Sequence, residues 1–458
     1  MANTNGHVSE KESPLALAES ILSLTQTLVR HLRETSHSLP DFSVSSPGPP
    51  LTSTYESLRF SLNTAALDLL RLVNGPKSTF RTFFTTHYDL AAYQVALEFK
   101  FFALVPLNSP ITVEALAKQA GIAEDRVGMV MRILATQRVF KEREKGVFEH
   151  TSASAVIARD PLLQDAFLMQ MDEMFRAASE TSSSLQASPY KFDGLNSPFA
   201  TRHKLPAYEY YKANPEKGAR FARAMAGVTR LDRQLVEVRD EFPWDTIGDG
   251  TLVDVGGGSG HIAISLAKSF PKMKCVIQDV SPLMLAPGQG LLDDSVRDRI
   301  EFMQHDFFQP QPLEANAYLI RQIVHNWNDE DCVRLFRAFV PALERCAPKT
   351  PLLINDTILP EIGEKTPYEE HGLRQLDIGM WVVLGAKQRS QEEIAALLRE
   401  ADPRFKIAKV HSKGSMGLVE VHLAKDEKLG AGLEGFKNTD AKNEAIELDR
   451  EFSKSDYS

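Results

Sequence analysis

The sequence has few cysteines, no long apolar run and no basic leader. Its three cysteines, Cys275, Cys332 and Cys346, do not follow metal-ligand spacing, which argues against a zinc site and against a disulfide framework. A membrane helix needs about 18 consecutive apolar residues, and the chain contains no such run. Residues 1–14 lack the basic and apolar stretches of a secretion signal. These absences predict a protein of the reducing cytoplasm that neither spans a membrane nor is secreted.

Positive charge is also scarce, because 52 Lys and Arg residues stand against 61 Asp and Glu residues and give a formal net charge of -9. This acidic balance argues against general binding of nucleic acids or anionic membranes, so we expect the partner to be a small molecule. The chain of 458 residues is 43% hydrophobic and 25% charged, as is usual for a globular protein of two or three domains.

A glycine-rich turn stands between a strand pattern at residues 252–255 and a helix pattern at residues 262–270. The glycines of this turn are Gly256, Gly257, Gly258 and Gly260. Because glycine has no Cβ, such a turn lets backbone N–H groups and a helix N-terminus approach a ligand closely. The dinucleotide fingerprint would require another glycine where His261 stands, so the turn disfavours NAD.

Carboxylates at the ends of neighbouring strand patterns suit a nucleoside. Asp279 ends the second strand pattern, where an acid can accept hydrogen bonds from both ribose hydroxyls. Asp306 ends the third, and Phe307 follows it, which suits the amino group and the flat face of adenine. Asp254 lies close to the glycine turn, where a cationic or amino-bearing tail is favoured over a pyrophosphate. Together these residues predict S-adenosylmethionine (SAM) as the ligand.

The N-terminal half is helical by pattern. Apolar residues recur at helical spacing over residues 56–105, and these faces are more apolar than a small isolated domain needs, which predicts dimerisation or burial against the rest of the chain. Residues 112–136 have the spacing of a helix-turn-helix, and residues 138–149 resemble a two-stranded wing. A SAM-sensing winged-helix regulator is therefore an alternative function. Against it, the second helix carries Val127, Met131 and Leu134, an apolar set that packs rather than reads bases.

Two further patterns concern a methionine-rich stretch and the large C-terminal region. Residues 167–175 are rich in methionine and form an adaptable apolar surface that suits either a core or a pocket for a flat hydrophobic substrate. From residue 251 onward strand and helix patterns alternate, which predicts a Rossmann-like α/β domain with a mostly parallel sheet between two layers of helices. Residues 405–412 and 417–423 predict an antiparallel hairpin at one edge of that sheet.

A histidine and a carboxylate follow adjacent strand patterns. His325 lies just beyond the fourth strand, and Asp356 lies at the end of the next one. The carboxyl ends of parallel strands form the edge where ligands bind, so we expect both side chains in one cleft. There a carboxylate would fix the imidazole tautomer and stabilise an imidazolium.

Residues 55–425 resemble the SAM-dependent O-methyltransferases of plants and fungi that act on phenolic and polyketide-type small molecules. The motifs that carry the resemblance are Val253-Asp-Val-Gly-Gly-Gly-Ser-Gly260, Gln278-Asp-Val280, His305-Asp-Phe-Phe308, Arg321-Gln-Ile-Val-His-Asn-Trp327 and Asn355-Asp-Thr-Ile-Leu-Pro360. The resemblance implies a homodimer whose N-terminal winged-helix-like region supplies the interface, without DNA.

The resemblance also implies roles for single residues. Gly256 and Gly258 would lie against the methionine portion of SAM, Asp279 would bind the ribose, and Asp306 with Phe307 would hold the adenine. Arg321 takes a position that is usually basic and near the cofactor. His325 matches the catalytic base of the family, and Asp356 matches a carboxylate that flanks it.

Two positions depart from the family pattern. Asn326 stands where Asp is common, and Gln388 stands where a second flanking Glu is common, so each removes a potential negative charge near His325. Fewer carboxylates should leave the imidazole less basic and its tautomer less firmly fixed. Some fungal relatives keep the fold and cofactor but promote cyclisation, so a SAM-dependent pericyclase or cyclase is a second alternative.

The prediction from the sequence is methyl transfer from SAM to a hydroxyl of a hydrophobic aromatic or polyketide-type molecule in fungal secondary metabolism, with His325 as general base and no metal. The expected division of the chain is a mobile arm at 1–55, a helical, winged-helix-like dimerisation and substrate-lid domain at 56–242, a SAM-binding catalytic domain at 243–424 and a disordered charged tail at 425–458.

Overall fold

The structure, a computed structural model, describes residues 13–50, 52–232 and 235–424. The charged tail expected at 425–458 lies outside the described residues. None of the helices within the described ranges combines the length and apolar character that a membrane crossing requires.

Two helices open the described chain and pack against each other: α1 (Pro14–Glu34) and α2 (Ser53–Glu98). The loop between them is tied to the next domain, since the backbone N–H of Ser152 donates to the Phe42 carbonyl over 3.1 Å and Arg159 donates to the Val44 carbonyl over 3.0 Å. Residues 13–50 therefore have contacts that the expected mobile arm would lack. Helix α1 buries Leu32, and the spacing of its apolar residues, rather than the polar loop that follows, determines how this segment packs.

Helix α2 is broken at Gly75, whose φ of 66° is not helical and precedes Pro76. On both sides of this kink the helix presents large apolar side chains to solvent, including Val73 at 70% and Phe83 at 69% exposure. The same exposed set contains Leu70, Leu72, Phe80, Phe84 and Tyr88. The described chain thus does not cover this surface itself.

The winged-helix-like region has the expected order, with one addition. Its elements are α3 (Phe101–Leu104), β1 (Ile111–Thr112), α4 (Val113–Ala120), α5 (Glu124–Thr136), β2 (Phe140–Glu144) and β3 (Val147–His150). The sequence predicted two strands, but β1 pairs with β3 and makes a three-stranded sheet. Val127, Met131 and Leu134 of α5 are buried, which confirms that this helix packs into a core.

Short helices connect this region to the large sheet. They are α6 (Ser152–Arg159), α7 (Pro161–Met169), a π-helical turn η2 (Gln170–Met174), α8 (Phe175–Ala178), α9 (Thr181–Ala187), η3 (Gly194–Asn196), α10 (Pro198–His203), α11 (Ala207–Ala213), α12 (Pro215–Asp232), α13 (Leu235–Glu241) and η4 (Trp244–Ile247). The stretch between α8 and α12 thus consists mostly of short helices.

The large sheet confirms the α/β prediction. Its strands are β4 (Thr251–Val255), β5 (Lys274–Asp279), β6 (Ile300–Gln304), β7 (Ala317–Arg321), β8 (Leu352–Leu359), β9 (Arg389–Ser390), β10 (Phe405–Ser412) and β11 (Gly414–Leu423). They are ordered β10-β11-β8-β7-β4-β5-β6, with β9 beside β8. Strands β4 to β8 are parallel where they pair, and β10 and β11 form the expected antiparallel hairpin, with β11 against β8.

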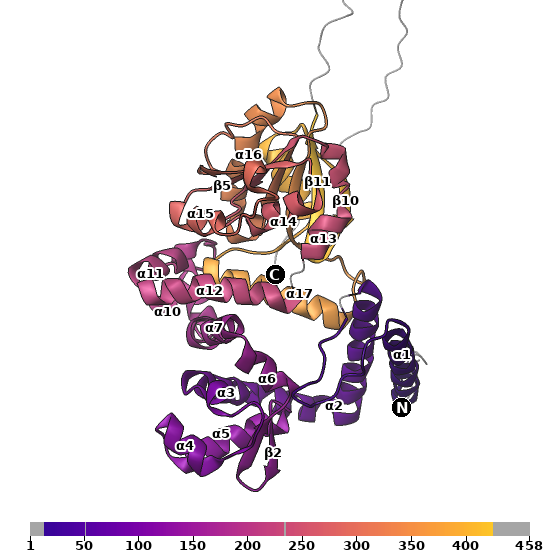
Figure 1. The fold of residues 1–458 in the computed structure, drawn as a ribbon, viewed down its shortest axis with the longest axis vertical. Helices are drawn as coiled ribbons and strands as arrows, with labels where there is room; N and C mark the ends of the chain where they lie inside the picture. The colour runs from indigo at the N-terminus through magenta and orange to yellow at the C-terminus, as the bar shows by residue number, and fades with distance from the viewer. Residues whose placement is uncertain (1–12, 51, 233–234, 425–458) are drawn as a thin grey trace, which may run out of the picture. The chain divides into compact units, whose positions relative to one another are not determined.

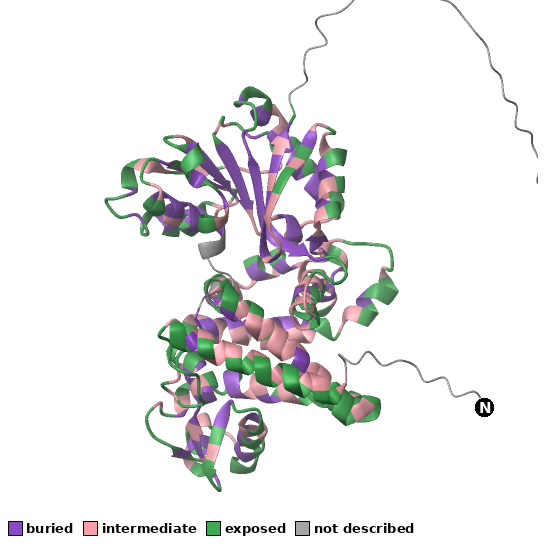
Figure 2. Cartoon of the chain, turned by 90° about the vertical axis from the view of Figure 1, so that its right-hand side faces the viewer, coloured by how far each residue is buried: buried purple, intermediate pink, exposed green. Residues whose placement is uncertain are grey.

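Helices cover both faces of this sheet (Figure 1). They are α14 (His261–Ser269), α15 (Pro282–Gln289), η5 (Arg297–Arg299), α16 (Asp329–Arg345) and α18 (Gln391–Ala401). The short turn η6 (Val324–Asn326) and the helix α17 (Pro367–Leu384) lie off these faces, and α17 contacts the N-terminal helices α2 and α10. Alternate strand residues point to opposite faces, so Val253 and Val255 join the core under α16, while Leu252 joins the core under α14. Figure 2 shows these central strands as buried.

The strand order reverses at β4, because β5 follows it on one side and β7 lies on the other. In open parallel sheets the crevice at such a reversal, beyond the carboxyl ends of the strands, is where ligands bind. The glycine turn, which follows β4 directly, therefore stands at the expected binding edge.

The core under α16 provides a first prediction. Phe339 is 1% exposed and its ring meets that of Tyr318 edge-on at 5.6 Å. Phe339→Ala should lower the free energy of unfolding by about 3–5 kcal/mol, because it removes buried contacts and leaves a cavity. Urea unfolding followed by circular dichroism checks this. Tyr190→Ala, at a side chain that is 98% exposed, is the control and should change the midpoint little; equal shifts would contradict the described core.

Candidate functional site

The glycine turn requires glycine for two reasons. At Gly260 the φ of 74° is left-handed, and a Cβ there would lie 2.2 Å from Ile277 Cδ1, so no other residue fits without a shift. At Gly258 the φ is 57°, but a Cβ would meet only Met284 Cε at 3.7 Å. The backbone at Gly258 thus faces open space, where a ligand can approach it closely.

Asp254 lies beneath this turn rather than beside it. It is 2% exposed, and a Cβ on Gly257 would lie 2.7 Å from its Cγ. Burial raises the pKa of Asp254 to about 7, against the opposing effect of the nearby Arg321 guanidinium. Its Oδ2 has no hydrogen-bond partner among the described residues. An unpaired carboxylate oxygen next to the turn suits a cationic group.

The other two nucleoside candidates lie at the ends of the next strands. Asp279 ends β5 and accepts a hydrogen bond from the Ser281 backbone N–H over 2.9 Å, while burial raises the pKa of its carboxyl. Phe307 lies against the turn, since a Cβ on Gly256 would be 3.6 Å from its ring. Asp306 precedes it and accepts from the Phe308 N–H over 3.0 Å. The strand ends thus bring most of the residues predicted for cofactor binding to one edge.

His325 and Asp356 are in direct contact. His325 Nδ1 bonds to Asp356 Oδ1, and the His325 backbone N–H donates to Asp356 Oδ2 over 3.2 Å. Asp356 is 2% exposed, and burial alone would raise the pKa of its carboxyl, but the His325 imidazole and the backbone N–H of Thr357 hold it below its usual value. The carboxyl therefore stays ionised and fixes the imidazole.

Gln388 does not join this pair. Its side chain is 1% exposed, and neither amide atom has a hydrogen-bond partner among the described residues. The catalytic role expected for Gln388 therefore stays a prediction. Its neighbour Arg389, which the sequence reasoning missed, donates to the carbonyls of Val324 over 2.9 Å and Trp327 over 2.8 Å, and so holds the η6 turn that carries His325.

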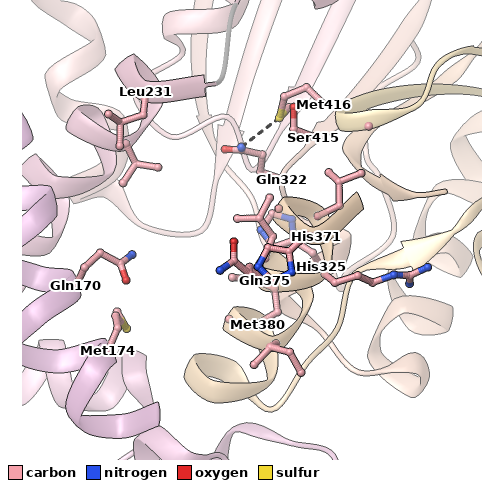
Figure 3. Close-up of a pocket in the computed structure, with 18 of the residues that line it drawn as sticks. Gln170, Met174, Leu231, Gln322, His325, His371, Gln375, Met380, Ser415 and Met416 are labelled. Carbon is pink, nitrogen blue, oxygen red and sulfur yellow. Dashed lines mark hydrogen bonds between the residues drawn. The ribbon is translucent and has the colours of Figure 1, made fainter. Parts of the chain in front are cut away.

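A cavity of 1430 Å³ opens in front of His325 (Figure 3). Its walls come from the sheet edge, from α17 and from the N-terminal helices. The methionine-rich stretch at 167–175 lines it, as one of the two sequence interpretations proposed, through Phe167, Met169, Met171, Met174 and Phe175. The arrangement fits a large apolar acceptor with a few polar contacts.

Polar residues of this cavity were missed by the sequence reasoning. His371 and Gln375 lie one turn apart on α17, and Figure 3 shows them next to His325. Gln322 also lines the cavity, with its side chain against Met416. Only the helical spacing of residues 371 and 375 could have indicated a shared face, and the sequence gives no sign of what that face meets.

The chain matches two protein families described as the O-methyltransferase domain, over residues 187–403, and the O-methyltransferase dimerisation domain, over residues 82–160. The O-methyltransferase sol2 of Alternaria solani is 47% identical over 428 residues, covering 92% of this chain and 99% of the relative. The chain belongs to the SAM-dependent O-methyltransferase family. This methyltransferase is also 31% identical to the chlorophenol O-methyltransferase of Trichoderma longibrachiatum, covering 88% of each chain.

Solved structures agree with the fold of this methyltransferase. The mitomycin 7-O-methyltransferase MmcR matches with a TM-score of 0.64 at 25% identity, covering 76% of this chain and 98% of that one. OxaC matches with a TM-score of 0.72 at 21% identity, covering 90% of this chain and all of that one. The enzyme is thus a SAM-dependent O-methyltransferase of the type found in fungal secondary metabolism, with a dimerisation domain ahead of its α/β domain.

The strand-end residues of the methyltransferase fit SAM. The open backbone at Gly258 can approach the methionine portion, and the unpaired Asp254 Oδ2 matches the positive charge of that portion. Asp279 stands at the strand end where the sequence predicts the ribose, and the Phe307 ring lies beside the glycine turn, where the sequence predicts the adenine. Arg321 donates to Asn355 Oδ1, and its charge opposes the rise in the pKa of Asp254.

Asp279 gives the second prediction. Asp279→Ala should weaken SAM binding by about 10-fold or more, because charge-assisted hydrogen bonds to ribose hydroxyls contribute roughly 1.5–3 kcal/mol each. Titration calorimetry measures the affinity. The matched control is Asp293→Ala. Asp293 makes a local turn of the same kind, in which it accepts from the Ser295 N–H over 3.0 Å, but its side chain is exposed. Unchanged SAM affinity in Asp279→Ala would remove this residue from the site.

Proposed function

We propose that this methyltransferase acts on a hydroxyl of a hydrophobic aromatic or polyketide-type molecule, with His325 as general base. The observation that carries the proposal is the contact of His325 Nδ1 with the ionised, buried Asp356 on the wall of a large, mostly apolar cavity. The relative named chlorophenol O-methyltransferase, after a phenol, supports the aromatic acceptor.

The proton chemistry follows from this contact. Because the Nδ1–H group donates a hydrogen bond to the Asp356 carboxylate, Nε2 carries the free lone pair that can accept another proton. Bound SAM supplies a methyl group on a positively charged sulfur. As the acceptor oxygen takes the methyl group, His325 Nε2 takes the hydroxyl proton, and Asp356 stabilises the resulting imidazolium. The apolar cavity walls hold the acceptor and exclude water.

The assembly proposed is a homodimer in the cytoplasm, with no nucleic acid or membrane as partner. The O-methyltransferase dimerisation domain and the exposed apolar side chains of α2 support it. We further propose that residues 56–242 serve dimerisation and cover the substrate, and that residues 243–424 form the catalytic domain, with Asp254, the glycines 256–258, Asp279, Asp306, Phe307 and Arg321 at the cofactor.

Mass spectrometry with methyl-labelled SAM and a panel of phenols tests the reaction. A labelled product and one S-adenosylhomocysteine per product are expected. Conversion of a substrate while the labelled SAM remains unconsumed would instead establish the pericyclase or cyclase alternative.

His325→Ala is the third prediction. It should leave SAM affinity near normal and lower the rate of methyl transfer by about 10²- to 10⁴-fold, the usual contribution of a positioned acid–base group. Raising the pH should restore part of the rate with a phenolic acceptor, because a free phenol ionises near a pKa of about 10 and then needs no base. Asp356→Asn should give a smaller loss of the same kind.

The matched control is His422→Ala, because His422 bonds to Glu420 over 2.8 Å as another histidine–carboxylate pair, on the edge hairpin. This variant should keep the normal rate. Methyl transfer by His325→Ala at the wild-type rate would overturn the mechanism.

The fourth prediction concerns assembly. The wild-type protein should sediment as a dimer at micromolar concentration, and Phe83→Asp should shift it towards monomer, because a charge in an apolar interface must be desolvated without a partner. Tyr190→Asp, at an aromatic residue exposed elsewhere, should remain dimeric. A monomeric wild-type protein would refute the proposed assembly.

A further inference from the structure

The wall of the cavity that faces His325 contains an irregular helical turn. Residues Gln170–Met174 form a π-helical turn, in which the backbone N–H of Phe175 donates to the carbonyl of Gln170. A π-helical turn shifts the following side chains around the helix axis and often occurs at functional sites. Here it interrupts a run of helix that would otherwise continue from α7 into α8.

Ion pairs hold this turn from behind. Arg220 of α12 donates to Asp172 Oδ2 and to Glu173 Oε1, each over 2.7 Å, and Lys217 also bonds to Asp172. Glu173 is 1% exposed, and its backbone carbonyl accepts a hydrogen bond from His203 Nε2 over 3.3 Å. Buried charges of this kind are costly unless they are paired, so the turn is fixed in one position relative to α12.

The front of the turn faces the cavity. Gln170 and Met174 both line it, and Figure 3 shows the Gln170 carboxamide pointing into the open space towards the wall that carries His325 and Gln375. The side chain of Gln170 has no hydrogen bond to another residue in the described part of the chain. Its neighbours on the same helical run, Met169, Met174 and Phe175, are apolar, so its amide is the polar group that this turn presents to the cavity.

The size of the cavity fits an acceptor that reaches both walls. Pockets for drug-sized ligands commonly measure about 300–1,000 Å³, and this one measures 1430 Å³. A single phenol ring bound at His325 would leave the opposite wall without contact. A molecule of several fused rings would reach the Gln170 wall.

We propose that Gln170 determines acceptor specificity by binding a second polar group, a hydroxyl or a carbonyl, at the far end of a multi-ring acceptor whose other end presents its hydroxyl to His325. This inference rests on the proposed function. A carboxamide both donates and accepts, so it fits either group. By holding the far end, Gln170 selects which hydroxyl reaches the base.

Two anthraquinones test the proposal by titration calorimetry on protein saturated with S-adenosylhomocysteine. Emodin carries hydroxyls on both outer rings, whereas alizarin carries them on one. Gln170→Leu should weaken emodin binding by about 10-fold, the scale of a lost hydrogen bond with a desolvated partner, and should leave alizarin binding unchanged. The control is Gln186→Leu, the same change at an exposed glutamine of α9 outside the cavity lining, which should alter neither affinity.

Equal losses for both compounds in Gln170→Leu, or no loss for either, would overturn the role of Gln170. A wild-type protein that binds neither anthraquinone would contradict the multi-ring acceptor. A second readout is the ratio of singly methylated emodin isomers, which Gln170→Leu should shift. If the wild-type protein binds emodin but transfers no methyl group to it or to the phenol panel, the proposed function fails, while the difference in affinity still decides the role of Gln170.

Discussion

The parallel pairing of β7 with β8 fixes the buried contact between His325 and Asp356 in the candidate site. Its register sets Arg321 opposite Asn355, so the residues that follow, His325 and Asp356, emerge at the same edge and reach bonding distance. A buried carboxylate is costly unless its oxygens are bonded, and here the His325 ring, the His325 N–H and the Thr357 N–H supply those bonds. A slip of one residue would turn Asp356 to the other face of the sheet and leave both groups unpaired.

The cofactor side of the site could be predicted because one rule governs it. Each residue expected there lies at or just beyond the end of a strand pattern, and parallel strands end at the same edge, so Asp254, Asp279 and Phe307 had to lie near the glycine turn. The strand-end rule does not apply to Gln388. It precedes the short strand β9, and its backbone N–H donates to Asp377 of α17 over 2.8 Å, so the packing of that helix, rather than a strand register, decides where its amide lies.

For the acceptor side of the site, the apolar nature of the surface could be predicted from the sequence, but its shape could not. The methionine-rich stretch indicated an adaptable apolar surface, but not that a π-helical turn would interrupt it or that Arg220 would clamp that turn. Such a turn depends on one shifted backbone hydrogen bond, which apolar periodicity does not encode. The break of α2 was not foreseen either, although Gly75 before Pro76 is a sequence signal for it, and neither was the packing of residues 13–50.

The two sides of the site also differ in how the chain builds them. One stretch of α/β sequence supplies every proposed cofactor contact, whereas the cavity takes its walls from α2, α7, η2, α12 and α17 as well as from η6. Substitutions in the N-terminal helices can therefore change the shape and polarity of the acceptor site without touching SAM or the His325–Asp356 pair. A family that places function in sites on a shared fold can vary in this way, and one relative at 31% identity is named for its own acceptor, chlorophenol. Gln170 lies across the cavity from His325. It belongs to the N-terminal helices, where substitutions leave the proposed cofactor contacts unchanged.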